Sequence, residues 1–262
     1  MLTGLLRKNA EARPRATAIV QGKRRITYQE LDRAAGRCAG FLRQHGVGSG
    51  DTVAAALPNC VEFIIAFFAV MRLRAILLPL NHGYTSDEMQ RTLAEGGARV
   101  VITDVKRESI CRECAGTATV VSVGQEDWAG CEEVPPQEDP FSGRALYLST
   151  SGSTDSYKRI CCTQENLHFE AYNFVETTGL SADDAILCTI PLFHSYGLGN
   201  CLLDALYTGA TLVLEADPEA PFAARSHQVL ELLRTESIGF YPGVPYQFEV
   251  LAASTMDVRS YF

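Results

Sequence analysis

The feature that most constrains the fold is an alternation, from Asp51 onward, of short apolar runs with longer segments of helical periodicity. The expected strands cover residues 52–57, 75–78, 99–103, 120–123, 145–148, 160–163, 185–189, 211–214 and 238–241. The expected helices between them cover residues 61–72, 86–95, 165–178, 199–207 and 222–235. Strands that alternate with helices of about ten to fifteen residues build parallel βαβ units. The sequence therefore predicts an α/β fold with helices on both faces of mostly parallel sheets.

The first fifty residues and the helix starts carry local signals. A helix over residues 2–13 precedes a hairpin of residues 18–20 and 25–27. Thr27 with Glu30, and Thr85 with Glu88, form the pattern of a capping box and predict helix starts. Asn59 is expected to cap the helix that begins at Val61.

The stretch over residues 147–158, Tyr-Leu-Ser-Thr-Ser-Gly-Ser-Thr-Asp-Ser-Tyr-Lys, follows an expected buried strand. Backbone N–H groups, hydroxyls and one lysine around a single loop suit a polyphosphate, which needs many short donors and a cation. The loop is not a Walker sequence, because Tyr157 rather than glycine precedes Lys158. The alternative is a surface turn rich in Ser, Thr and Gly.

Composition excludes several classes of protein. A net charge of −8 argues against nonspecific nucleic-acid binding, and no apolar run is long enough to span a membrane. The N-terminus shows no signal-peptide pattern. Nine cysteines without a framework predict free thiols, which fits a cytoplasmic location.

Four separate stretches then match one family in order. They are residues 27–31 with 46–63, residues 78–81 (Leu-Pro-Leu-Asn), the hydroxyl loop with residues 163–167, and residues 191–198 (Pro-Leu-Phe-His-Ser-Tyr-Gly-Leu) with 243–245. Together they show that the chain resembles the N-terminal part of the adenylate-forming ligases, which include acyl- and aryl-CoA synthetases, luciferases and the adenylation domains of peptide synthetases.

The resemblance implies stacked, mostly parallel sheets with helices on both faces, lacking the later strands and the mobile C-terminal domain of that family. Residues 1–262 would be the N-terminal portion of an adenylation domain. Within it, residues 51–180 would form one αβα lobe carrying the phosphate loop, and residues 1–50 with 181–262 an incomplete second lobe.

The resemblance also implies a two-step reaction that uses ATP and Mg²⁺. A carboxylic acid attacks the α-phosphate and pyrophosphate leaves; the acyl group then passes to the thiol of CoA or of a carrier protein. The loop would hold the departing phosphates, and Lys158 would act as a catalytic cation. The phosphate-binding residues so implied are Thr150, Ser151, Gly152, Ser153, Thr154 and Lys158.

The same resemblance places His194, a further catalytic candidate, and Tyr196 beside the acid pocket and the thiol channel. Tyr241, Gly243, Val244 and Pro245 match a stretch that contributes to that pocket. Two alternatives remain open: His194 as a loop histidine satisfied by backbone groups, and Tyr241 as a core aromatic residue. No metal ligand is assigned.

The sequence departs from the family at Asp155, Tyr157 and Arg159, where glycine, proline and glycine are usual, and at Arg74, where a small residue is usual. The later ribose, magnesium and lysine motifs are not found. We therefore expect that activity needs a complementing C-terminal segment, and that an unpaired sheet edge associates with that segment or with a second copy. The alternative function is a non-catalytic binding or scaffolding subunit.

Asp155 leads to the first testable prediction. A carboxylate about 4 Å from a phosphate oxygen is repelled by roughly 4 kcal/mol at an effective dielectric of about 20. Allowing for solvent screening, Asp155→Gly is expected to tighten ATP or pyrophosphate binding by on the order of 1 kcal/mol, measured by titration calorimetry. Equal or weaker binding would mean that Asp155 turns outward or holds a magnesium ion.

Overall fold

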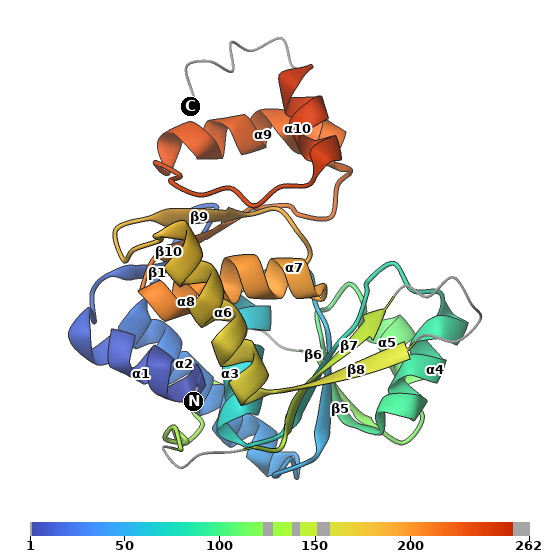
Figure 1. The fold of residues 1–262 in the computed structure, drawn as a ribbon. Coiled ribbons are helices and arrows are strands. Elements are labelled where there is room, and N and C mark those ends of the chain that lie inside the picture. The colour runs from blue at the N-terminus through green and yellow to red at the C-terminus, as the bar shows by residue number, and fades with distance from the viewer. Residues whose placement is uncertain (1, 123–127, 138–141, 151–157, 254–262) are drawn as a thin grey trace.

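The structure is a computed structural model that describes residues 2–122, 128–137, 142–150 and 158–253. Its strands form two sheets (Figure 1). The six-stranded sheet has the order β6-β5-β3-β4-β7-β8 and the four-stranded sheet the order β2-β1-β10-β9. The strands are β1 Thr17–Gln21, β2 Arg24–Thr27, β3 Thr52–Ala56, β4 Ile76–Pro79, β5 Ala98–Thr103, β6 Thr119–Ser122, β7 Arg144–Thr150, β8 Lys158–Thr163, β9 Ala185–Cys188 and β10 Thr211–Leu214.

The helices cover the faces of both sheets. They are α1 Leu2–Ala12, α2 Tyr28–Gln44, α3 Val61–Arg72, α4 Ser86–Gly96, α5 Glu108–Cys114, α6 Gln164–Thr178, α7 Ser195–Gly197, the π-helix η1 Leu198–Leu203, α8 Asp204–Thr208, α9 Phe222–Thr235 and α10 Pro245–Ala252. In Figure 1, α9 and α10 lie on the outer face of the four-stranded sheet, and α4 and α5 lie beside the six-stranded one. None of the described helices is long and apolar enough to cross a lipid bilayer.

Alternate residues along each strand define three buried clusters. Val53 and Ala55 of β3 join the largest cluster with α1, α2 and α3, whereas Ala54 joins a cluster with α4 and α5. Ile19 of β1 faces the largest cluster, and Val20 faces α9 and α10. Because successive side chains of a strand point to opposite faces, both sheets are covered on two sides. The expected α/β fold with stacked, mostly parallel sheets is confirmed.

Local signals place most element boundaries as the sequence predicts. Thr27 and Thr85 form complete capping boxes with Glu30 and Glu88, and β1 and β2 form the expected antiparallel hairpin. All nine cysteines lie within the described residues and are free, as predicted.

Three expectations about elements were wrong or incomplete. Residues 238–241 form no strand, only an isolated bridge between Ile186 and Phe240. The expected helix 199–207 begins earlier, at Ser195, and contains a π-helical turn. The helix α5 was not anticipated, because its seven residues are too few to show a clear period.

Buried ion pairs fix helices against one another. Arg72 at the end of α3 pairs with Asp32 of α2, and both side chains are almost fully buried. Arg72 Nη1 also donates to the Val134 carbonyl at 2.8 Å, and Arg7 of α1 reaches Asp32 Oδ2 at 2.8 Å. Asp32 and Arg72 thus join α1, α2, α3 and the connection that precedes β7. Removing one partner would leave an uncompensated buried charge.

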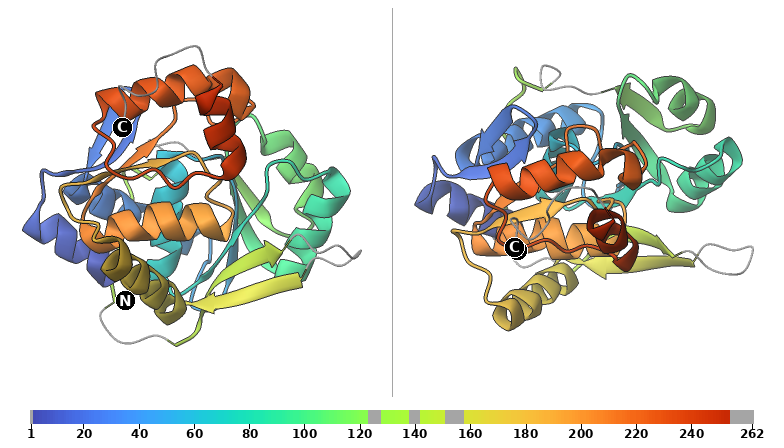
Figure 2. Two further views of the ribbon diagram at one scale, coloured as in Figure 1. Left: turned by 45° about the horizontal axis from the view of Figure 1, so that its top comes forward. Right: turned by 90° about the horizontal axis from the view of Figure 1, so that it is seen from above.

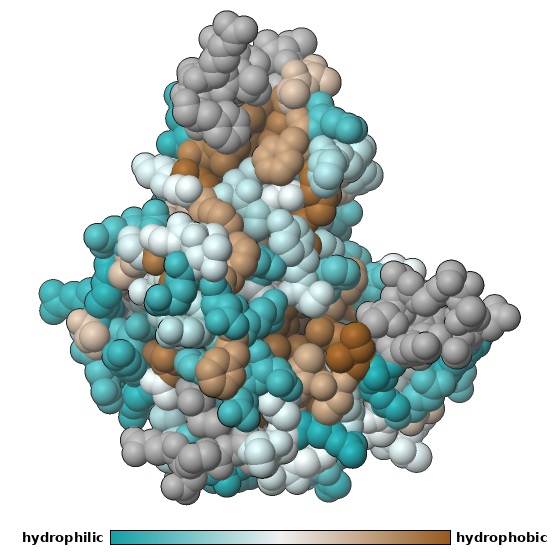
Figure 3. Space-filling view, in the orientation of Figure 1, coloured by the Kyte–Doolittle hydropathy of each residue, from teal (hydrophilic) through white to brown (hydrophobic). Residues whose placement is uncertain are grey.

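The surface of the molecule is uneven in polarity. Figure 3 shows polar side chains over the lower left of the molecule, and apolar ones gathered near α9 and α10 and beside β8. Among the described residues, Tyr246 and Phe248 of α10 and Ile160 of β8 are large apolar side chains that are exposed. Single exposed apolar residues of this kind are ordinary on protein surfaces.

Asp204 of α8 is a buried acid without a hydrogen-bond partner among the described residues. Burial raises the pKa of its carboxyl to about 8, and repulsion from Glu170 of α6 adds to the shift. Between the ordinary pKa near 4 and pH 8, folded Asp204 holds a proton that the unfolded chain has lost. Rising pH therefore favours unfolding across this window.

We predict that the free energy of unfolding of the wild-type chain falls by on the order of 3 kcal/mol more between pH 5 and pH 8 than that of Asp204→Asn. Urea denaturation at both pH values measures this difference. Asp183→Asn, whose side chain is 95% exposed, is the control and should keep the wild-type pH dependence. An unchanged pH dependence in Asp204→Asn would show that the Asp204 carboxyl is ionised in the folded chain.

Candidate active site

The two ends of the predicted phosphate loop are paired in a hairpin. The strands β7 and β8 run antiparallel, and their register places Thr150 opposite Lys158. Figure 2 shows this hairpin at the rim of the molecule in two views. Residues 151–157, which include Ser151, Gly152, Ser153 and Thr154, lie outside the described residues, as do the side chains of Thr150 and Lys158. Their assignment to phosphate binding stays a prediction.

Arg159, the residue after Lys158, is engaged away from the loop. Its guanidinium donates to the carbonyl of Glu95 at the end of α4 and lies 4.9 Å from the centre of the Tyr147 ring. The hydrogen bond ties the loop end of the hairpin to α4, and the cation–π contact links the two strands of the hairpin.

His194 directly precedes α7 as its N-cap and is exposed. Its Nδ1 accepts a hydrogen bond from the Tyr196 backbone N–H at 3.2 Å, so the imidazole serves as the cap of this helical turn. Because Nδ1 accepts, a neutral ring carries its proton on Nε2. The backbone contact expected of an ordinary loop histidine is present, and the exposed ring keeps Nε2–H as a donor.

A tight turn brings Tyr196 close to the second predicted stretch. A Cβ at Gly197 would collide with the Pro191 carbonyl oxygen, so only glycine fits. The Tyr196 hydroxyl donates to the Gly243 carbonyl at 3.4 Å. The structure therefore brings together two segments that lie nearly fifty residues apart, as the predicted acid pocket requires.

A polar cluster lies beside this contact. The Tyr241 hydroxyl is 3.3 Å from Thr189 Oγ1 and 3.3 Å from Gln247 Oε1. Burial raises the pKa of Tyr241 to about 12, so its hydroxyl stays protonated at neutral pH. Tyr241 is half-buried, packs against the buried cluster of α9 and α10, and is hydrogen-bonded, so its position is compatible both with a core role and with a role in the acid pocket. Val244 precedes α10, and Pro245 is the first residue of that helix, where its missing N–H costs nothing.

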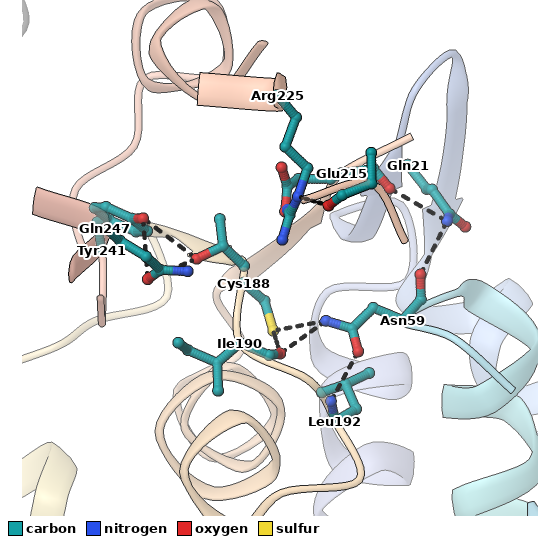
Figure 4. Close-up of polar contacts among 11 residues, drawn as sticks. Gln21, Asn59, Cys188, Ile190, Leu192, Glu215, Arg225, Tyr241 and Gln247 are labelled. Carbon is teal, nitrogen blue, oxygen red and sulfur yellow. Dashed lines mark hydrogen bonds and ion pairs between the residues drawn. The ribbon is translucent and has the colours of Figure 1, made fainter. Parts of the chain in front are cut away.

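Asn59 has a different role from the one expected. It does not cap α3, whose N-cap is Cys60 without a side-chain hydrogen bond. Instead, Asn59 Nδ2 donates to the Ile190 carbonyl at 2.7 Å, and its Oδ1 accepts from the Leu192 N–H at 2.7 Å. Figure 4 shows the Asn59 carboxamide beside Ile190 and Leu192, which precede His194 in the chain. The only hint in the sequence was that Asn59 comes three residues after the end of a buried strand.

Gln21 extends this contact to the four-stranded sheet (Figure 4). Its Nε2 donates to the Asn59 carbonyl at 3.2 Å, and its Oε1 accepts from the Val61 N–H at 3.2 Å. Gln21 ends β1, and Asn59 follows β3, so the pair joins the two sheets at the carboxyl ends of parallel strands. In open α/β sheets this is the side on which ligands bind.

The described residues test the fit of ATP and Mg²⁺ only in part. The pairing of Thr150 with Lys158 places both ends of the loop together, as a phosphate cradle needs. Among the described residues, no group of three or more His, Cys, Asp and Glu side chains converges on a possible metal position. A magnesium ion would therefore take ligands from the phosphates or from residues outside this set.

Comparisons with known proteins agree on one family. The family model described as "AMP-binding enzyme" matches residues 6–260. A feruloyl-CoA synthase from Amycolatopsis sp is 33% identical over 249 residues, which are 94% of this chain and 49% of that protein. The chain spans about half the length or less of the curated relatives it matches first.

Solved structures show the same likeness. The N-terminal domain of FACL13 from Mycobacterium tuberculosis has a TM-score of 0.88 at 25% identity, over 97% of this chain and 65% of that one. An ATP-bound MatB from Rhodopseudomonas palustris has a TM-score of 0.86 at 25% identity, over 97% of this chain and 52% of that one.

We predict that Asn59→Leu destabilises the chain by about 3 kcal/mol, because two buried backbone groups lose their partners. Urea denaturation measures the loss, and amide hydrogen exchange at Leu192 should accelerate. Asn173→Leu, on an exposed position of α6, is the control and should change neither quantity appreciably. Unaltered exchange at Leu192 would show that this loop does not depend on Asn59.

Proposed function

We propose that this chain, which belongs to the AMP-binding enzyme family, forms the N-terminal portion of an enzyme that joins a carboxylic acid to AMP and then to a thiol. The family is an adenylate-forming lineage, and the relatives found are CoA ligases and synthetases. The observation that carries the proposal is the contact between Tyr196 and Gly243, which joins the two segments of the predicted acid pocket.

Each proposed residue has a role that follows from its position. Lys158 would neutralise charge on the departing phosphates together with the donors of residues 150–154. The Nε2–H of His194 would donate to an oxygen of the acid or guide the incoming thiol. The partly exposed surface of Tyr196, Tyr241 and Gly243 would hold the body of the acid. Such a site lowers the barrier by positioning and by charge neutralisation.

We also propose that ATP is the nucleotide and that Mg²⁺ accompanies it, with CoA or a carrier-protein thiol as acceptor. Family membership supports nucleotide use, and the relatives' names support CoA. The names of the relatives differ in their acids, so we extend only the general class, a carboxylic acid, to this chain.

A complementing segment is part of the proposal. The four-stranded sheet ends at β9, beyond which the described residues contribute only the bridge at Phe240. The Phe240 carbonyl accepts from the Leu187 N–H at 3.0 Å, so this edge already takes one added stretch of backbone. Further strands from a C-terminal segment, or the same edge of a second copy, would extend the pairing.

We expect no acid-dependent exchange of pyrophosphate into ATP by the 262-residue chain alone, and measurable exchange once the remaining half of such an enzyme is supplied as a second polypeptide. Lys158→Ala should abolish the exchange of the complemented protein. If the pure 262-residue chain catalyses exchange, and Lys158→Ala abolishes that exchange, the need for a second segment is contradicted. If the second polypeptide binds the chain and the complex is folded but shows no exchange, the non-catalytic scaffolding role is favoured.

A further inference from the structure

The loop that carries His194 has a second contact with the six-stranded sheet. Asn59, three residues after the end of β3, holds the backbone of this loop with its carboxamide (Figure 4). His82 comes three residues after Pro79, the end of the neighbouring strand β4. Its ring meets Phe193, which directly precedes His194. Two neighbouring strand ends of one sheet therefore contact the same loop of the other.

A short turn fixes the place of His82 at the end of β4. The Gly83 N–H donates to Asn81 Oδ1 at 2.9 Å, and the Tyr84 N–H donates to the Asn81 carbonyl at 3.1 Å. Asparagine favours such turns because its side chain bonds the backbone two residues further on. These two bonds close the turn around His82, so the backbone at this position is set before the ring makes its contact.

The rings of His82 and Phe193 meet edge to face. Their centroids lie 5.3 Å apart, and their planes are inclined by 80°. Aromatic pairs favour this arrangement because the positive edge of one ring lies against the negative face of the other. Both residues are half-buried, and His82 Nδ1 is buried without a hydrogen-bond partner among the described residues. That nitrogen does not hold the ring, whereas the contact with Phe193 does.

The surroundings of His82 keep its imidazole neutral. Burial lowers the pKa of the ring, repulsion from the Arg107 guanidinium lowers it further, and Asp104 opposes the shift. A histidine whose pKa lies below the ordinary value of about 6.5 is uncharged at neutral pH. Arg107 is itself paired with Asp104 and with Glu219, which follows β10 of the other sheet. The neutral His82 ring can therefore pack on Phe193 without the cost of burying a charge.

Phe193 connects this contact to the candidate site. The His194 N–H donates to the Pro191 carbonyl at 3.1 Å, so the backbone turns within these four residues. Beyond the turn, His194 Nδ1 accepts from the Tyr196 N–H. Phe193 lies inside the turn, next to His194, and reaches the six-stranded sheet through His82.

We propose that His82 is a positioning residue of the candidate active site, because its ring holds Phe193 and thereby sets the place of His194. The inference rests on the proposed function, which assigns His194 to that site. His82 acts through Phe193 and does not touch the acid, the nucleotide or the thiol in this role.

Removal of the ring tests the proposal in the 262-residue chain. In His82→Ala, hydrogen exchange of the Tyr196 amide, followed by NMR, should accelerate about fivefold, the effect of losing one aromatic pair. Exchange of the Leu192 amide, which Asn59 holds, should not change. His82→Phe keeps an aromatic ring and should restore the wild-type rate at Tyr196. His227→Ala removes an exposed histidine of α9 and is the control that should alter neither amide.

The two amides separate positioning from general stabilisation. A residue that only stabilises the fold would accelerate both amides by the same factor in His82→Ala, because both would exchange through global unfolding. Equal acceleration, an unchanged rate at Tyr196, or failure of His82→Phe to restore that rate would overturn the proposal.

Activity of the complemented protein gives an independent measurement. His82→Ala should lower kcat of acid-dependent pyrophosphate exchange about fivefold without changing KM for ATP, and His82→Phe should keep the wild-type kcat. If the complemented wild type exchanges and His82→Ala has the same kcat, the positioning role is overturned. If the complemented wild type shows no exchange, the proposed function is contradicted, and the two amides still decide whether His82 positions His194.

Discussion

One carboxamide, that of Asn59, holds the two sheets in the register on which the candidate site depends. It donates to and accepts from the backbone on both sides of Pro191, and both contacts measure 2.7 Å. Gln21, at the end of β1 in the other sheet, donates from Nε2 to the Asn59 carbonyl. The position of His194 is therefore set by β3 of one sheet as much as by β9 of the other. A side chain with only a donor or only an acceptor could not satisfy both the Ile190 carbonyl and the Leu192 N–H.

The two halves of the candidate site come from different sheets. The two strands that flank the proposed phosphate loop form a hairpin at the edge of the six-stranded sheet, and the proposed acid pocket uses segments that follow β9 and β10 of the four-stranded one. Nucleotide and acid would meet between them, so the relative position of the sheets controls the reaction geometry. Besides Asn59 and Gln21, an ion pair between Arg107 after β5 and Glu219 after β10 spans the same boundary. Polar contacts, and not apolar packing alone, thus set the distance between the two binding surfaces.

The sequence was sufficient for the fold because most of its elements have strong local signals. Capping boxes at Thr27 and Thr85 and continuous apolar runs mark element starts without reference to the rest of the chain. Asn59 was misassigned because the same short amide that caps a helix also bonds distant backbone, and only the tertiary structure shows which partner is present. Gln247 was not singled out from the sequence; its partners Tyr241 and Val244 lie close before it in the chain, but Thr189 lies 58 residues away. Of the residues that the family resemblance assigned to the acid pocket, Tyr196 and Gly243 contact each other across the chain, and the assignment itself stays a prediction; residues 151–157 of the loop are not described.

Arg74 departs from the family in its residue type and has an unusual backbone conformation. The sequence has arginine where a small residue is usual, and the φ angle there is +53°, in the left-handed region that favours glycine. The family preference at this position therefore has a conformational reason. Here the surrounding structure holds an arginine in that conformation, although the side chain makes it less favourable.

The hairpin of β7 and β8 has a consequence for how the two strands are held together. Their pairing runs from Arg144 opposite Thr163 to Thr150 opposite Lys158. Across the ladder, the Arg159 guanidinium of β8 lies 4.9 Å from the centre of the Tyr147 ring of β7. None of the paired residues lies between positions 151 and 157, so a substitution there changes no residue of the ladder.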